Sequence, residues 1–173
     1  LQQRLLDAGL WDTGIIAAER REMKPEVNDN LTVKVTLKAD GSVEKAVVAS
    51  IAEKVYLYGS EARLKEIFEN PSLQMVSFTI TEKGYALYDA NGELLPDIAA
   101  DLAGGPEDAK SYMGKLTGLL CARYMKNKAP LAMVSMDNCS HNGDKLKAAI
   151  TAFAEGWVKN GVAEPGFEAY VKG

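Results

Sequence analysis

The chain has 173 residues, of which 47% are apolar and 25% charged, and its formal net charge is 20 − 24 = −4. These proportions exclude disordered and collagen-like classes, and the length suits one domain with a buried core. The sequence lacks a basic stripe interleaved with aromatic residues, which argues against a nucleic-acid partner.

Neither a membrane span nor a disulfide framework is expected. No apolar run approaches the roughly 20 residues that a membrane helix requires. No secretion signal opens the sequence. The two cysteines, Cys121 and Cys139, do not make a disulfide framework, so we expect a reduced, cytoplasmic protein without a membrane partner.

The first elements are a helix end and a strand. Residues 1–9 have the spacing of an amphipathic helix that stops at Gly9, and we expect its start to lie before Leu1. Residues 14–18 form an apolar run that ends at Glu19, which is typical of a buried strand whose end meets water.

A β-hairpin and a helix follow. Residues 31–37 alternate apolar and polar side chains, and Asp40-Gly41 separates them from a second run at 43–51. Because Asp-Gly accepts the positive φ values of a tight turn, this pattern predicts a hairpin. Helical spacing over 60–70, with Ser60 as a plausible N-cap, predicts the helix.

The second half of the chain alternates strands and helices. The patterns predict strands at 74–80 and 130–134, helices at 106–126 and 144–159, and a tight turn at 90–92. Buried strands that alternate with helices indicate the α/β class with a largely parallel sheet. Ligands of such sheets bind beyond the carboxyl ends of the strands.

Polar residues follow three predicted strands, at Glu19, at 81–85 and at 137–142. In the last of these segments, the amide of Asn138 could donate a hydrogen bond to a carbonyl or developing alkoxide oxygen. Ser140 and Asn142 are as readily explained as caps of the following helix. His141, the only histidine, is more simply a structural or surface group, and with Cys139 alone it cannot complete a metal site.

The remaining candidates have two interpretations each. Glu19 could be the acidic residue that binds the adenosine ribose diol in dinucleotide-binding folds, or it could belong to a surface salt-bridge cluster. Arg20 and Arg21 beside it would instead favour a 2′-phosphate. Lys83 is either a solvated charge or a proton-transfer or Schiff-base lysine. The sequence contains no Gly-x-Gly-x-x-Gly loop.

Two motifs resemble signatures of the mannitol dehydrogenase family of polyol-specific long-chain dehydrogenases. They are Thr79-Ile-Thr-Glu-Lys-Gly-Tyr85 and Ser135-Met-Asp-Asn-Cys-Ser-His-Asn-Gly143. The segments 5–16 and 41–51 also look like that family, so the resemblance runs to about Trp157.

The resemblance implies a Rossmann-type domain that binds NAD(H), or in some members NADP(H), and a C-terminal helical domain that supplies an acid–base lysine, without a metal. By the Asp-Asn match, Asn138 would be a catalytic and substrate-polarising residue, and Asn142 would also contact substrate. The loop that would line the coenzyme cleft consists of Thr81, Glu82, Lys83, Gly84 and Tyr85. Glu19 would be a further coenzyme contact.

Two family features are not in this sequence: the Gly-rich coenzyme loop and the Lys-x4-Asn-x2-His signature of the helical domain. We therefore expect 1–161 to be a partial NAD-binding domain with an inserted β-hairpin, lacking its first strand and Gly-rich loop. We expect 162–173 to lead toward the missing helical domain of the same chain.

The expected activity is hydride transfer between NAD(H) and a polyol or sugar acid. The form of the second motif favours D-mannonate/fructuronate, then tagaturonate, then mannitol/fructose, and residues 1–173 alone are expected to be inactive. The alternative is a nucleotide-binding or assembly module without chemistry of its own.

Overall fold

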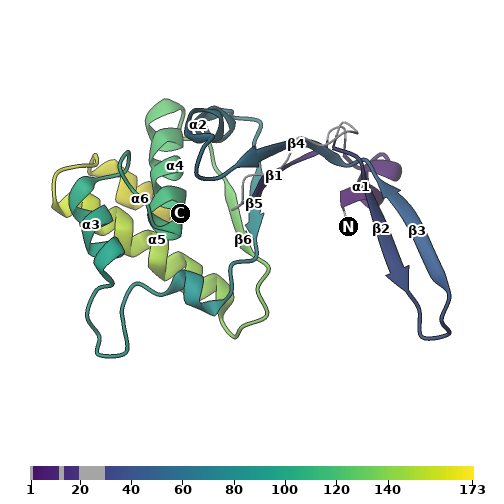
Figure 1. The fold of residues 1–173 in the computed structure, drawn as a ribbon. Coiled ribbons are helices and arrows are strands. Elements are labelled where there is room, and N and C mark those ends of the chain that lie inside the picture. Colours follow the sequence, from purple (N-terminus) through teal and green to yellow (C-terminus); the bar gives the residue numbers. More distant parts are fainter. Residues whose placement is uncertain (1, 12–13, 20–29) are drawn as a thin grey trace. The chain divides into compact units, whose positions relative to one another are not determined.

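The structure, a computed structural model, describes residues 2–11, 14–19 and 30–173 (Figure 1). The chain divides into two compact units, Leu1–Leu64 and Lys65–Gly173. Arg20 and Arg21, the residues weighed for a 2′-phosphate, lie outside the described residues.

The first unit contains a short helix and a pair of parallel strands. Helix α1 (Gln2–Asp7) ends at Gly9, whose φ of 67° lets the Leu10 amide donate to the Leu5 carbonyl at 2.9 Å. This is the glycine-terminated helix end that the sequence predicted. Strand β1 (Ile15–Glu19) pairs in parallel with β4 (Ile51–Tyr56), so the carboxyl ends of the two strands lie together.

An antiparallel hairpin lies between β1 and β4 in the sequence. Strands β2 (Thr32–Leu37) and β3 (Val43–Val48) pair along their whole length. At the turn, Gly41 has a φ of 81° and the Asp40 carboxylate accepts the Ser42 amide at 2.9 Å, as the Asp-Gly signal predicted. One face of this hairpin carries five exposed apolar side chains: Val33, Val35, Leu37, Val43 and Val47.

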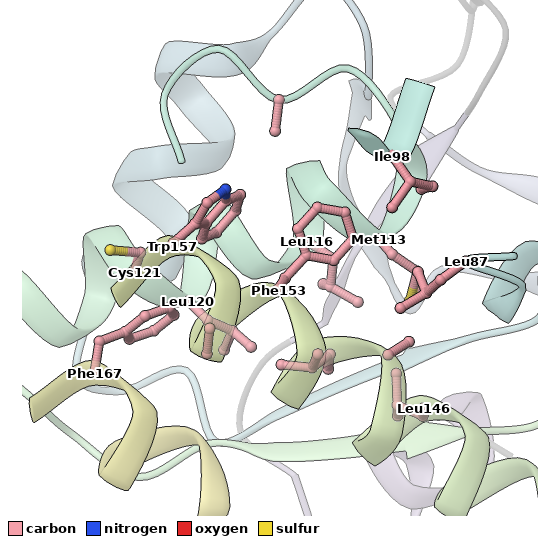
Figure 2. Close-up of a cluster of buried hydrophobic side chains, with 14 of the residues drawn as sticks. Leu87, Ile98, Met113, Leu116, Leu120, Cys121, Leu146, Phe153, Trp157 and Phe167 are labelled. Carbon is pink, nitrogen blue, oxygen red and sulfur yellow. The ribbon is translucent and has the colours of Figure 1, made fainter. Parts of the chain in front are cut away.

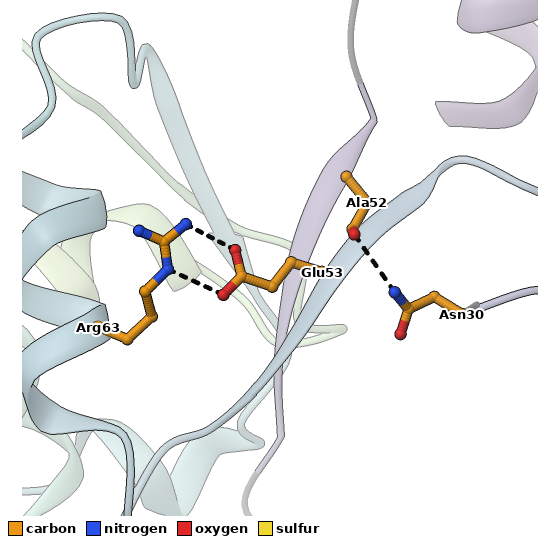
Figure 3. Close-up of polar contacts among 4 residues, drawn as sticks. All are labelled: Asn30, Ala52, Glu53 and Arg63. Atoms are coloured by element: carbon orange, nitrogen blue, oxygen red, sulfur yellow. Dashed lines mark hydrogen bonds and ion pairs between the residues drawn. The ribbon is translucent and has the colours of Figure 1, made fainter. Parts of the chain in front are cut away.

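An ion pair joins β4 to the helix that follows it. Figure 3 shows the guanidinium of Arg63, in α2 (Glu61–Glu69), donating from Nε and Nη2 to the two carboxylate oxygens of Glu53 at 2.9 and 2.8 Å. This hydrogen bonding lowers the pKa of Glu53. On the other side of β4, the Asn30 amide donates to the Ala52 carbonyl at 3.3 Å.

The second unit combines a parallel strand pair with helices. Strand β5 (Met75–Phe78) pairs in parallel with β6 (Ala132–Ser135), and Phe78 lies opposite Ser135. A 3-10 helix, η1 (Glu82–Tyr85), follows β5. The four α-helices are α3 (Pro96–Gly104), α4 (Tyr112–Lys126), α5 (Asn142–Lys159) and α6 (Gly166–Lys172).

The core of the second unit lies between these helices. Figure 2 shows α5 contributing Leu146, Phe153 and Trp157 to it, against Met113 and Leu120 of α4. These positions keep the helical spacing that the sequence displayed, so the apolar stripes of the two helices are their buried faces. Phe153 and Trp157 are fully buried, with ring centroids 5.2 Å apart.

A buried arginine connects the loops beneath this core. Arg123 of α4 has no exposed surface, and its guanidinium donates to five backbone carbonyls of the described residues. The acceptors and distances are Phe68 2.6 Å, Asn70 2.8 Å, Ala129 2.8 Å, Leu73 2.9 Å and Pro130 3.1 Å. One side chain thus holds together the chain that enters β5 and the chain that enters β6.

The α/β class with an inserted hairpin is confirmed, but two of the predicted elements have different bounds for structural reasons. The run 43–51 is two strands, because the chain leaves the hairpin after Val48 and starts β4 at Ile51. The helix expected from residue 106 begins only at Tyr112, because the buried Asp101 carboxylate accepts the amides of Lys110 and Ser111, both at 2.8 Å, and the Ser111 hydroxyl caps the helix.

Helices α3 and α6 were not predicted. Both are short, nine and seven residues, so their sequences carry little periodic signal. Their stability comes from tertiary contacts: Phe167 of α6 is fully buried, and the Asp101 carbonyl of α3 accepts the indole N–H of Trp157 at 2.9 Å.

Candidate functional site

The candidate site lies beyond the carboxyl ends of β5 and β6. Because these strands are parallel and in register to Phe78 and Ser135, the segments that follow them leave the sheet at the same edge. The Met136 amide extends the pairing by donating to the Phe78 carbonyl at 2.9 Å. The structure therefore brings together two of the three polar clusters that the sequence predicted at strand ends, 81–85 and 137–142.

Asp137 joins the two segments. Its Oδ2 accepts the Ile80 amide at 3.0 Å, and its Oδ1 accepts the Thr81 amide at 2.8 Å. Oδ2 also accepts the hydroxyl of Tyr85, which lies 2.6 Å from the Ser135 hydroxyl. Both Asp137 and Tyr85 are buried, so this carboxylate is a buried acceptor shared by the turn and by η1.

The ionisation of the two residues follows from these bonds. The backbone amide of Ile80, followed by the Tyr85 hydroxyl, lowers the pKa of Asp137 below its usual 3.8. Burial, together with the hydrogen bond to Asp137, raises the pKa of Tyr85 to about 12. The pair is therefore a carboxylate that accepts from a neutral phenol at neutral pH.

The turn held by Asp137 is strained and closely packed. Thr81 has φ 67° and ψ 162°, a region that β-branched residues rarely adopt. Gly84 is needed for space, since an added Cβ would lie 2.8 Å from two side-chain carbons of Ile80. A turn of this kind persists only where surrounding contacts determine it.

The other predicted residues of the turn are exposed. The carboxylate of Glu82 forms an ion pair with the ammonium of Lys145, which ties η1 to α5. The same bond raises the pKa of Lys145. Lys83 is exposed.

Asn138 and Asn142 differ in their contacts. Asn138 directly follows Asp137 and is exposed; among the hydrogen bonds of the described residues, none involves its side chain. The Asn142 amide donates to the Asp137 carbonyl at 2.7 Å, and its oxygen accepts the Gly143 amide at 2.7 Å. His141 occupies the N-cap position of α5 with φ 56° and makes no capping hydrogen bond through its side chain.

Glu19 lies in the first unit. It is the last residue of β1, it is exposed, and it lies opposite Tyr56 at the end of β4. An exposed carboxylate at the carboxyl end of a parallel strand has the position that ribose recognition requires.

The sequence did not single out Asp137 or Ser135 as site residues. Their partners lie 50 to 57 residues earlier in the chain, so no local spacing announces the contact. One signal was available: Asp137 is an acidic residue two positions after the end of β6, and a carboxylate that becomes buried there without a partner would be costly. In the described part of the chain, no group of three or more His, Cys, Asp or Glu could hold a metal ion, and no described helix is long and apolar enough to cross a membrane.

Parallel strand pairs with covering helices and polar residues at the strand ends define an α/β domain of the Rossmann type. The protein-family model described as the mannitol dehydrogenase Rossmann domain matches residues 10–169 of the sequence. The chain therefore belongs to the mannitol dehydrogenase family, as its two motifs predicted.

Curated relatives agree with this assignment. The chain is 41% identical over 180 residues to D-mannonate oxidoreductase of Thermotoga maritima, covering 98% of this chain. It is 32% identical over 151 residues to mannitol 2-dehydrogenase of Pyrenophora tritici-repentis, covering 86% of this chain. The matched region is 33% of the first relative and 26% of the second, so the chain spans about a third or less of their lengths.

Two solved structures resemble the chain. A mannitol 2-dehydrogenase from Pseudomonas fluorescens, in a ternary complex with NAD and D-mannitol, has a TM-score of 0.66 and 30% identity, and the match covers 83% of this chain and 28% of that one. A D-sorbitol dehydrogenase in substrate-free form has a TM-score of 0.76 over 98% of this chain and 36% of that one; at 20% identity it shows the fold alone.

Proposed function

We propose that this chain is the coenzyme-binding part of an oxidoreductase that transfers a hydride between NAD(H) and a polyol or sugar acid. The observation that carries the proposal is the joining of two family motifs at one sheet edge, through the bonds of Asp137 to Ile80, Thr81 and Tyr85. The proposed substrate is of the D-mannonate/fructuronate type, then tagaturonate, then mannitol/fructose. The 41% identity to a D-mannonate oxidoreductase, against 32% to a mannitol 2-dehydrogenase, supports this order.

The described residues fit two parts of a dinucleotide. Glu19 presents an exposed carboxylate at the end of β1, which suits the adenosine ribose diol. The turn of Thr81, Glu82, Lys83, Gly84 and Tyr85 leaves β5 at its carboxyl end, which suits the coenzyme cleft. NAD, when bound, accepts or supplies the hydride. The coenzyme assignment is supported by the related mannitol 2-dehydrogenase, which was solved with NAD; NADP remains the second candidate.

Asn138 is proposed as the catalytic residue of this chain. Its exposed amide follows the fixed Asp137, and an amide N–H held near a reacting carbonyl stabilises the negative charge that develops on the oxygen. Asn142 is proposed as a further substrate contact at the start of α5. Neither residue moves the proton of the reaction, and no lysine of this chain is assigned that role.

The remaining parts of the site are proposed to lie outside these 173 residues. We propose that a first strand and its Gly-rich loop precede 1–161, and that 162–173 leads to a helical domain with the acid–base lysine. Support comes from the share of the relatives that is matched, which is 33% of one and 26% of the other.

The experiment is a spectrophotometric assay of the full-length protein with fructuronate, tagaturonate and fructose, each with NADH and with NADPH. We expect NADH oxidation, fastest with fructuronate. NADH binding without oxidation by any of the three sugars would favour the non-catalytic module instead. Residues 1–173 alone, assayed with D-mannonate or mannitol and NAD, should show no turnover; measurable turnover would contradict the proposed role of the missing lysine.

A further inference from the structure

We propose that Asp137 is a positioning residue, which holds Asn138 and the Ile80–Tyr85 turn in one arrangement at the ends of β5 and β6. The inference rests on the proposed roles of Asn138 and of this turn. It assigns a distinct task to a buried carboxylate that the proposed function leaves unused.

The side chain of Asp137 determines the path of the turn. Its two oxygens accept two consecutive backbone amides, those of Ile80 at 3.0 Å and Thr81 at 2.8 Å, and also the Tyr85 hydroxyl. A carboxylate is the side chain that can accept all three, because it carries no proton of its own at neutral pH. These bonds fix both ends of the segment from Ile80 to Tyr85.

The backbone of Asp137 determines the position of Asn138. The Asp137 carbonyl belongs to the peptide that carries the Asn138 amide nitrogen, and it accepts the Asn142 side chain at 2.7 Å. With its side chain bonded to the turn and its carbonyl bonded to α5, Asp137 leaves the next residue little backbone freedom. The exposed Asn138 amide is therefore presented from a fixed Cα.

The strain at Thr81 indicates that the turn is held against its own preference. The φ of 67° is unfavourable for a β-branched residue, and the bonds to Asp137 are at Thr81 itself and at the residue before it. Without the carboxylate, the turn would relax toward an ordinary backbone conformation. The residues that line the proposed coenzyme cleft would then move relative to Asn138.

A second buried aspartate provides a matched control. Asp101 also accepts two consecutive backbone amides, those of Lys110 and Ser111, both at 2.8 Å, but it belongs to α3 and holds the segment before α4 rather than the strand ends. Asp101→Asn and Asp137→Asn remove the same chemistry. Both substitutions should lower stability, whereas only Asp137→Asn should act on the reaction through Asn138.

The kinetic test is a double-mutant cycle in the full-length protein. Asp137→Asn should lower kcat about 10- to 100-fold in the wild-type background, because misplacing a reacting group by about 1 Å costs a factor of this size. In the Asn138→Ala background the same change should lower kcat by a clearly smaller factor, since Asn138 is no longer there to be misplaced and only the displacement of the turn remains. Equal effects in both backgrounds would overturn the proposal, and Asp101→Asn should leave kcat near the wild-type value.

Amide hydrogen exchange gives a readout that does not depend on activity. Asp137→Asn should speed exchange in both 78–86 and 136–143, and Asp101→Asn in neither. If exchange in 78–86 is unchanged, Asp137 does not hold the turn and the proposal fails. Absence of turnover in the unmodified protein would instead count against the proposed function. If Asp137→Asn does not fold, Tyr85→Phe removes the hydroxyl with its contacts to Asp137 and Ser135, and should show the same dependence on Asn138 at about two- to fivefold.

Discussion

The hydroxyl of Tyr85 donates a hydrogen bond to the carboxylate of Asp137, a residue 52 positions later in the chain. Tyr85 belongs to η1, which follows β5, and Asp137 follows β6. The bond therefore links the two segments that form the candidate site in the second unit. The Ser135 hydroxyl lies 2.6 Å from the same phenol oxygen, so the three side chains form one polar group in which Tyr85 and Asp137 are buried.

Tyr85→Phe should lower the free energy of unfolding by about 1.5 kcal/mol, the usual net value of a hydrogen bond to a charged group. The aromatic ring and its packing remain in the variant, so the change in the free energy of unfolding measures the contribution of the hydroxyl alone. Urea denaturation gives the value. Tyr88→Phe is the control, because that residue is 56% exposed. Equal losses in the two variants would show that the bond to Asp137 adds nothing.

The acid stability of the protein should depend on Asp137. Its pKa lies below the usual 3.8 because it accepts the Ile80 amide and the Tyr85 hydroxyl. A carboxyl with a lowered folded-state pKa stabilises the fold above its unfolded pKa, and the stabilisation is lost as the pH falls through the folded pKa. The stability difference between wild type and Asp137→Asn should therefore be constant from neutral pH to about 5 and shrink below about 4.

Urea midpoints of the two proteins, measured at a series of pH values, test this expectation. A difference that is independent of pH down to about 2.5 would mean that the charge on Asp137 does not contribute to stability.

Asn138→Ala in the full-length protein should lower kcat about 100-fold, the size reported by removal of one oxyanion donor. Stability should change little, since the side chain is exposed. Steady-state kinetics and a thermal melt measure the two quantities. Asn91→Ala, at an exposed turn outside the site, is the control and should alter neither. Normal kcat with a lower melting temperature would assign Asn138 to a structural role instead.

Thr81→Gly should raise the free energy of unfolding by about 1 kcal/mol. Glycine adopts the positive φ of position 81 at no steric cost, which relieves strain of about 1–3 kcal/mol, and the gain exceeds its extra entropy in the unfolded chain. Thr79→Gly is the matched control: position 79 is exposed and has no positive φ, so the same change should destabilise by roughly 0.5–1 kcal/mol. Destabilisation by both changes would show that the backbone at Thr81 is not strained.

Arg123→Met should destabilise the second unit by more than about 3 kcal/mol, because buried carbonyls lose their charged donor. The side chain is fully buried and bonds five carbonyls, so water cannot replace it without opening the core. Chemical denaturation measures the loss. Arg63→Met removes a guanidinium that is 47% exposed and should cost at most about 1 kcal/mol. A comparable cost for the two arginines would contradict the role assigned to Arg123.

The sequence predicted the two segments that form the candidate site, but not the side chain that joins them. Strands β5 and β6 and the polar segments after them were predictable, because short apolar runs ended abruptly in Thr81–Tyr85 and Asp137–Asn142. The carboxylate that joins the segments was not, because hydrogen bonds between residues more than 50 positions apart leave no periodic trace. Parallel pairing predicts that strand ends meet, but not which side chain connects them.

The same distinction applies to the fold. Helices α4 and α5 were predicted from their apolar stripes, although α4 begins later than expected because Asp101 and Ser111 fix its start. Strand β4 was hidden, since it continues the apolar run of β3 and only its pairing with β1 separates the two. The structural role of Arg123 could not be predicted from the sequence, because the groups that it bonds are backbone carbonyls, which every residue has.

The β2–β3 hairpin has a consequence for handling the isolated chain. Its five exposed apolar side chains share a face with a single charge, Lys45, on two strands that pair only with each other among the described residues. Exposed strands of this kind can pair with strands of other molecules, and a charged lysine among the apolar side chains opposes such association. Because salt screens that charge, concentrated solutions of residues 1–173 should lose colloidal stability as ionic strength rises, and low-salt buffers are the better choice for storage.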